Sequence, residues 1–173
     1  MSDTLVTIVA IGLAAVLMFV FPLMTMSDRT DDVSKLTVET ATTEFVDEIR
    51  TTGKITPDKY SKFIENIGST GNTYDVEMEV KVKDENPVKK TTQTAKDKIG
   101  ENVYYSVYTS QIEEKLNANQ DYKLKEGDIV SVDVKNTNQT LSQQLKNFFY
   151  SVVGKDTYTI AASHAGIVTA TGK

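Results

Sequence analysis

The stretch TLVTIVAIGLAAVLMFVFPLMTM, residues 4–26, contains no ionisable side chain and decides how the rest of the chain is organised. As a helix it extends roughly 34 Å, which is enough to cross the ~30 Å hydrocarbon core of a bilayer. It is apolar on every side, unlike the amphipathic helix of a soluble core. We therefore expect residues 1–26 to form a retained transmembrane helix.

A cleaved signal peptide is the main alternative for this segment. Such a peptide needs a basic start and a cleavage site flanked by small residues. Residues 1–3 carry no basic side chain, and Phe21-Pro22-Leu23-Met24 is a poor cleavage site. The pattern favours an anchor that stays on the chain.

Small residues inside the helix predict close packing between helices. These residues are Ala10, Gly12, Ala14 and Ala15, of which Ala10 and Ala14 form a small-xxx-small pair. Pro22 interrupts the backbone ladder, so it is expected to kink or loosen the helix. Both features suit a helix that packs against copies of itself, although Ala and Gly are also simply common in membrane helices.

A second helical stretch is expected at residues 27–53, as a stem. Its apolar face is Val38, Ala41, Phe45 and Ile49 at three- and four-residue spacing, and Gly53 ends it. Joined to the anchor, it makes a rod of roughly 73 Å. One small domain cannot bury all of such a rod, so part of it must face lipid or neighbouring chains.

Residues 54–173 are expected to form a head that mixes helices and strands without regular βαβ alternation, which makes the chain α+β. Thr56-Pro57-Asp58 begins a helix that ends at Gly68. Apolar residues alternate with charged ones from Tyr74 to Val82, and Val130, Val132 and Val134 alternate with polar residues. A short helix is expected over residues 111–119, with Ile112 and Leu116 apolar. The remaining elements are a helix capped by Thr140 and stopped by Gly154, with Leu141, Leu145, Phe148, Phe149 and Val152 apolar, and a last strand that starts just after Asp156 and carries Tyr158 and Ile160.

Two further groups of residues have open interpretations. Lys89, Lys90, Lys96 and Lys98 form either a solvated loop, which we favour, or a basic patch for an anionic lipid or polymer. Tyr104, Tyr105 and Tyr108 are either interface anchors or a face packed on the sheet.

The composition excludes several classes of function. A net charge of −5 and a pI near 5.0 disfavour nucleic acid as the main partner. There is no Cys, and His164 is the only histidine, so sites that need thiolates or two imidazoles are excluded. No phosphate-binding glycine motif occurs, and Asp31-Asp32 and Glu113-Glu114 are interpreted as solvated helix faces. We expect no enzyme, no catalytic or metal-binding residue and no cofactor, and the sequence identifies no small-molecule substrate.

Several segments taken together resemble the TadE-like pilins and pseudopilins of bacterial type IV pilus-like and tight-adherence (Tad) machinery. The segments are the anchor, Asp31-Asp32, Ala41-Thr42-Thr43-Glu44-Phe45-Val46-Asp47, Gly53-x-Ile55-Thr56, Tyr60-x-x-Phe63, Thr70-Gly71-Asn72-Thr73-Tyr74-Asp75, Gly127-Asp128-x-Val130-x-Val132 and Ala165-Gly166. The resemblance covers most of the chain. It implies a hydrophobic helix at the centre of an assembly, a head outside the cell, and a secretion ATPase and membrane platform as partners.

One departure from that family concerns the leader. Type IV prepilins carry a short basic leader and an acid five residues into the mature helix, whereas here the helix begins almost at Met1 and the nearest acid is Asp3. Either no prepilin peptidase acts on the chain, or this sequence is the mature form. The departure favours a minor pilin or assembly factor over the shaft subunit of a long filament.

Two hypotheses of function follow. The first is a structural subunit of a pilus-like export, adhesion or conjugation apparatus, which assembles with like subunits through its N-terminal helix and faces membrane lipid. The second is a monomeric, membrane-anchored extracellular binding or sensor module. Charge counting alone, with Arg29 and Lys35 after the helix, slightly favours a cytoplasmic head. The extracellular location rests on the resemblance.

Overall fold

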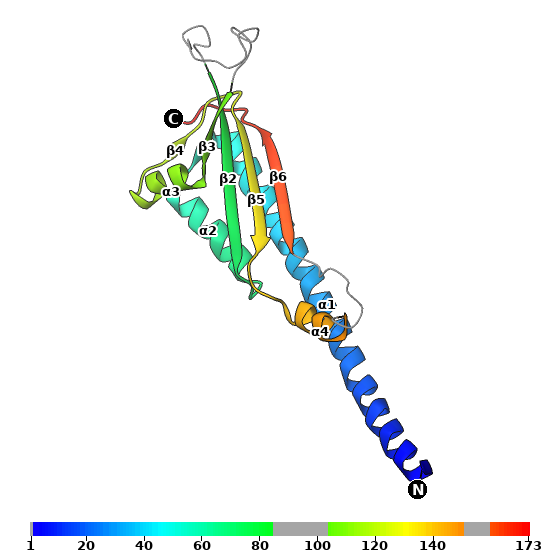
Figure 1. Cartoon of the computed structure of the whole chain (residues 1–173). Coiled ribbons are helices and arrows are strands. Elements are labelled where there is room, and N and C mark those ends of the chain that lie inside the picture. The colour runs from blue at the N-terminus through cyan, green and yellow to red at the C-terminus, as the bar shows by residue number, and fades with distance from the viewer. Residues whose placement is uncertain (1, 85–103, 151–159) are drawn as a thin grey trace, which may run out of the picture.

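The computed structural model describes residues 2–84, 104–150 and 160–173. It consists of one long helix and a head that packs along the C-terminal half of that helix (Figure 1). Helix α1, Ser2–Thr52, has 51 residues and is therefore about 75 Å long. The expected anchor and stem are thus one continuous helix, which runs through Pro22 without ending there.

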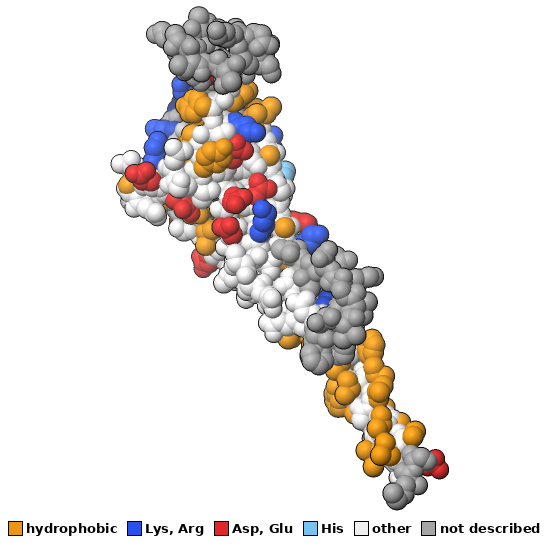
Figure 2. Space-filling model, in the orientation of Figure 1, with side chains coloured by type: hydrophobic (Ala, Val, Ile, Leu, Met, Phe, Trp, Pro, Cys, Tyr) orange, Lys and Arg blue, Asp and Glu red, His pale blue; other side chains and the backbone are white. Residues whose placement is uncertain are grey.

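A four-stranded antiparallel sheet has the order β3-β2-β5-β6. Its strands are β2, Tyr74–Lys83; β3, Tyr104–Tyr108; β5, Ile129–Asn136; and β6, Ala161–Ile167. The alternation predicted for β2 and β5 is confirmed, because Val80 pairs with Val130 and Met78 with Val132 on the buried face. The opposite face carries charged residues such as Glu77 and Lys135 and is open to solvent (Figure 2).

The core lies between this sheet and α1, and α2 covers part of the same helix. Its residues are all less than 9% exposed: Val38, Ala41, Phe45, Val46, Ile49, Ile55, Phe63, Ile67, Met78, Val80, Ile112, Leu116, Tyr122, Leu124, Val130, Val132, Val134, Ile160, Ala162 and Val168. A quarter of them come from α1 alone, so the second half of the long helix is the central element of the head.

Helix α2, Pro57–Gly68, begins as predicted, with the Lys59 amide donating to the Thr56 hydroxyl at 3.3 Å. The spacing of Tyr60, Phe63, Ile64 and Ile67 predicts one apolar face for this helix. Ile64 is 38% exposed, so the prediction is wrong for that residue. The apolar face that α2 packs against α1 therefore lacks one of the four residues that the spacing predicts. Helix α3, Thr109–Asn117, buries Ile112 and Leu116 as expected.

Short strands β1, Lys54–Ile55, and β4, Tyr122–Lys123, pair antiparallel with each other. They join the end of α1 to the segment that follows α3. Tyr104, Tyr105 and Tyr108 are between 38% and 59% exposed in β3, so they are strand residues at the surface. The lysines at 89, 90, 96 and 98 lie outside the described residues.

Helix α4, Leu141–Tyr150, starts after Thr140 as predicted, but Leu141 is 54% exposed and does not join the core. Val152 and Gly154 lie outside the described residues, as does Tyr158. The last strand spans Ala161–Ile167, so Ile160 lies just before the strand and not within it as expected. Ile160 is buried next to it.

Candidate functional site

The N-terminal half of α1, residues 4–26, packs against no part of the head for most of its length and is called the bare helix below. Its 18-residue apolar window has a mean hydropathy of 2.7 and none of it is buried, so one helix is long and apolar enough to cross a membrane. Its large side chains are strongly exposed, for example Ile8 at 71% and Phe19 at 76%. Figure 2 shows this helix as an apolar rod projecting from the head. In water such a surface is unfavourable by roughly 25 cal/mol per Å², so it requires lipid or protein around it.

The small residues of this rod do not form a single patch. With about 100° between successive residues, Ala10 and Ala14 share one face, whereas Gly12 lies on nearly the opposite side with Ala15 closer to it. All four are exposed, and a Cβ added at Gly12 would meet nothing within 4 Å. The helix therefore offers two narrow faces where another backbone can approach closely.

The predicted stem face lies inside the head. Val38, Ala41, Phe45 and Ile49 are all buried, and the Phe45 ring stacks on Phe63 of α2 with centroids 4.4 Å apart. These side chains bind α1 to its own head, so they are not the surface that meets lipid or a neighbour. In contrast, Val33 and Leu36 on the same stem are each 64% exposed.

Helix α4 is held to α1 near the point where the bare segment ends. Asp28 pairs with Lys146 and accepts a hydrogen bond from Ser142, and Asp31 accepts one from Thr140 at 2.7 Å. Thr140 and Gln143 form a reciprocal capping box at the start of α4. Lys146, and then Ser142, hold the pKa of the Asp28 carboxyl below its ordinary value of 3.8.

The interpretation of the acidic clusters as solvated faces is therefore wrong at two positions. Asp31 is used by α4, and Glu113 accepts a hydrogen bond from the Tyr60 hydroxyl at 2.6 Å. Burial, together with this bond, raises the pKa of Tyr60. Their neighbours Asp32 and Glu114 are exposed as expected. Sequence spacing gave no sign of these partners, because each lies on another element.

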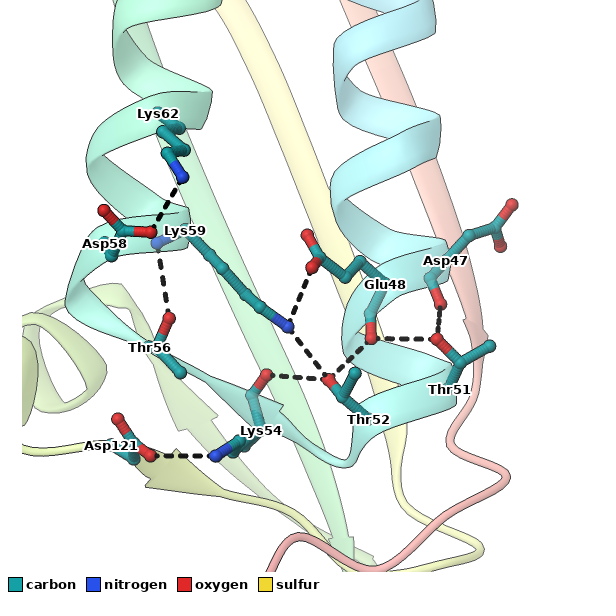
Figure 3. Close-up of polar contacts among 10 residues, drawn as sticks. All are labelled: Asp47, Glu48, Thr51, Thr52, Lys54, Thr56, Asp58, Lys59, Lys62 and Asp121. Carbon is teal, nitrogen blue, oxygen red and sulfur yellow. Dashed lines mark hydrogen bonds and ion pairs between the residues drawn. The ribbon is translucent and has the colours of Figure 1, made fainter.

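The C-terminal end of α1 is fixed to the head by a polar network (Figure 3). Lys59 of α2 contacts Glu48 at 2.8 Å and Thr52 at 3.5 Å, and Lys54 pairs with Asp121 at 3.3 Å. Gly53 ends the helix with a positive φ of 68°, as predicted. Its carbonyl accepts a hydrogen bond from Leu124 at 2.8 Å. Hydrogen bonds and ion pairs thus hold the end of α1 to the head.

Arg50 links the C-terminal end of α1 to the end of β6 and the segment after it. Its Nε donates to the Ile167 carbonyl at 3.0 Å, and its own carbonyl accepts the Thr169 amide at 2.9 Å. A Cβ at Gly166 would lie 2.4 Å from the Arg50 Nε, so the glycine makes room for this side chain. His164 lies nearby, half-buried in β6, with its Nε2 3.8 Å from an oxygen of Asp47.

In the part of the chain that the structure describes, no group of three or more His, Asp or Glu side chains is placed to hold a metal ion. The clearest functional feature is therefore a surface: a bare apolar helix rigidly joined to an α+β head. No family model, curated protein sequence or solved structure matches the chain.

Proposed function

We propose that this protein is a membrane-anchored, pilin-like structural subunit of a Tad-like export, adhesion or conjugation apparatus. It is inserted in the membrane through the bare half of α1, with the head on the extracellular side. It assembles with like subunits and the secretion machinery through the same helix, and acts as a minor pilin or assembly factor without an enzymatic activity. The family relationship to TadE-like proteins remains part of this proposal.

The observation that carries the proposal is that one unbroken helix is bare and apolar in its first half and forms the core of the head in its second. A simple anchor needs no rigid connection to the domain that it holds. Here the helix enters the head directly and is fixed at both ends of the contact, by Asp28 and by Arg50. Such a connection transmits the position of the helix to the head.

A second observation favours contact between chains over anchoring alone. Leu36 is exposed although it lies ten residues beyond Met26, which is about 15 Å along the helix. Hydrocarbon around residues 4–26 does not extend that far along a helix that stands upright in the membrane. Val33 and Leu36 together therefore provide an apolar surface for a neighbouring subunit outside the lipid.

Cysteine cross-linking tests this arrangement directly, because the chain contains no cysteine of its own. We expect Leu36→Cys to give disulfide-linked dimers in membranes of cells that make the protein. The product should decrease when Ala14→Leu is added, since the larger side chain separates helices that meet on that face. Leu13→Phe, which adds volume on a side of the helix outside both small-residue faces, is the control and should leave the dimer unchanged.

Replacing residues 4–26 with an unrelated apolar helix distinguishes the two functions. A structural subunit should lose both the cross-link and its presence in the sheared surface fraction, while the chain still inserts in the membrane. If the replaced chain keeps its cross-link and its surface activity, the helix serves only as an anchor and the proposal is refuted in favour of a monomeric binding module.

A further inference from the structure

A cavity of about 370 Å³ opens at the end of the head remote from the bare helix. Residues from the end of β2, the start of β3, α3, β4 and the segment before β5 line it. Its charged side chains are four lysines and two aspartates, so lysines are in excess, and Tyr105 and Tyr122 also line it. The charged residues are Lys83, Lys115, Lys123, Lys125, Asp84 and Asp128. Figure 1 places the end of β2 and the whole of β4 at the opposite end of the molecule from the N-terminus.

The lysines of this cavity differ from those of a second groove on the head, in which acids outnumber lysines. In the groove between α1 and α2, Lys59 pairs with Glu48 at 2.8 Å and Lys62 with Asp58 at 3.0 Å (Figure 3). Lys83, Lys115 and Lys123 have no carboxylate oxygen within 4.0 Å among the described residues. Among the described residues, no carboxylate forms an ion pair with these three ammonium groups.

The cavity is also held in place by a buried carboxylate. Asp128 is 2% exposed, and its two oxygens accept the backbone amides of Lys83 at 3.0 Å and Lys125 at 2.8 Å. This carboxylate fixes the two segments that carry those lysines. A site arranged in advance loses less entropy when a ligand binds.

The aromatic residues add a second kind of contact. The Lys115 ammonium lies 5.0 Å from the centre of the Tyr122 ring, within cation–π distance. Burial, and then the neighbouring Tyr105 and Asp128, raise the pKa of Tyr122 to about 12. The cavity thus combines ammonium groups for an anion with one exposed aromatic ring, that of Tyr105, for an apolar ring face.

We propose that this cavity binds a sugar that carries a phosphate or carboxylate group, with the lysines contacting the anion and the exposed Tyr105 ring contacting the sugar ring. Its volume lies at the lower end of ligand pockets, which suits a single sugar unit. The sugar is either free or one unit of a polymer. A net charge of −5 on the whole chain opposes a long nucleic acid.

The proposed binding of a sugar does not depend on the proposed assembly function. Only the exclusion of lipid headgroups as ligands depends on that function: if α1 spans the membrane, the headgroups around α1 lie at the other end of the molecule and do not reach the cavity. Replacing the anchor helix leaves the cavity unchanged, so loss of assembly with retained binding would refute the proposed function and leave this inference standing.

Titration of the full-length chain in non-ionic detergent micelles, followed by calorimetry and by NMR chemical shifts, tests the inference. We expect saturable binding of glucose 6-phosphate, weaker binding of inorganic phosphate, and none of glucose. A phosphodiester-linked sugar oligomer binding more tightly than glucose 6-phosphate would identify a polymer as the source, and the reverse order would identify a free sugar. Either result supports the cavity.

The double variant Lys115→Gln/Lys123→Gln should weaken glucose 6-phosphate binding by about tenfold or more, since two charge-assisted contacts are removed. The matched control is Lys59→Gln/Lys62→Gln, which makes the same change of charge at paired lysines and should leave binding unchanged. Tyr105→Leu should weaken glucose 6-phosphate but not inorganic phosphate. Near-UV circular dichroism checks that each variant is folded.

Four results would overturn the inference. They are no saturable binding by the native chain, equal losses in the two lysine double variants, equal affinity for glucose 6-phosphate and inorganic phosphate, and tighter binding of oligothymidylate than of any sugar phosphate. The last result would assign the cavity to nucleic acid.

Discussion

Replacing Gly53 with alanine tests how the rod is joined to the head. Gly53 has a φ of 68°, a conformation that costs an alanine about 1–2 kcal/mol. A Cβ at this position would also lie 2.2 Å from the Ala170 carbonyl oxygen and 2.4 Å from the Gly172 nitrogen. Both are backbone atoms, so no side-chain rotation relieves the overlap.

The magnitude follows from the bonds that must shift. Separating these segments weakens the 2.8 Å bond from the Leu124 amide to the Gly53 carbonyl and the 3.0 Å bond from the Gly172 amide to the Leu124 carbonyl. At about 0.5–1.5 kcal/mol each, these losses add about 1–3 kcal/mol to the conformational cost. We therefore expect Gly53→Ala to reduce the free energy of unfolding by about 2–5 kcal/mol.

Gly71 provides a matched control. Its φ of 78° demands the same backbone conformation, but a Cβ there would meet nothing within 4 Å. Gly71→Ala should therefore cost only the conformational part, about 1–2 kcal/mol. Urea unfolding of the full chain in non-ionic detergent, followed by near-UV circular dichroism of its tyrosines, measures both values. Equal costs for the two variants would refute the reasoning that the C-terminal segment packs against Gly53.

Three other predictions concern the junction between α1 and the head. Gly166→Ala should reduce the free energy of unfolding by about 1–2 kcal/mol, because the added methyl group displaces Arg50 from the Ile167 carbonyl. It should cause no further loss when Arg50→Ala is already present. A double-mutant cycle in which the two losses add would contradict this prediction. The pKa of the Asp28 carboxyl is lowered in the folded chain, so this group stabilises the fold fully above pH 3.8, and the stabilisation is lost as the pH falls below that value. The difference in free energy of unfolding between the native chain and Asp28→Asn should therefore shrink when unfolding is measured at successively lower pH. Phe45→Ala should reduce the free energy of unfolding by about 3–5 kcal/mol in the same urea assay, and a loss below about 1 kcal/mol would show that the stacked ring is not part of the core.

Local patterns predicted much of the fold because they depend on neighbours in the sequence. The Thr56 cap, the alternation from Tyr74 to Val82 and the stop at Gly53 each follow from backbone geometry within a few residues. These features are present in the structure at the expected positions, within one or two residues.

Contacts between distant residues were not predictable in the same way. Asp31 and Thr140 are 109 positions apart, and the pattern around Asp31 was that of an ordinary solvated face. In the sequence, Gly166 is one of several small residues, and only the structure places the Arg50 side chain against it. The four lysines of the distal cavity are separated by up to 42 positions, so no motif joins them.

The sequence by itself determined that a helix apolar on every side leads into an α+β head, because apolar length and hydrophobic period are properties of consecutive residues. Only the tertiary structure decided which face of the stem belongs to the head and which remains open for a neighbour. It also decided which lysines are neutralised by carboxylates and which are not. The physical reason is that burial and charge pairing depend on distances in space, which the strand order and the packing of α2 and α4 against α1 set.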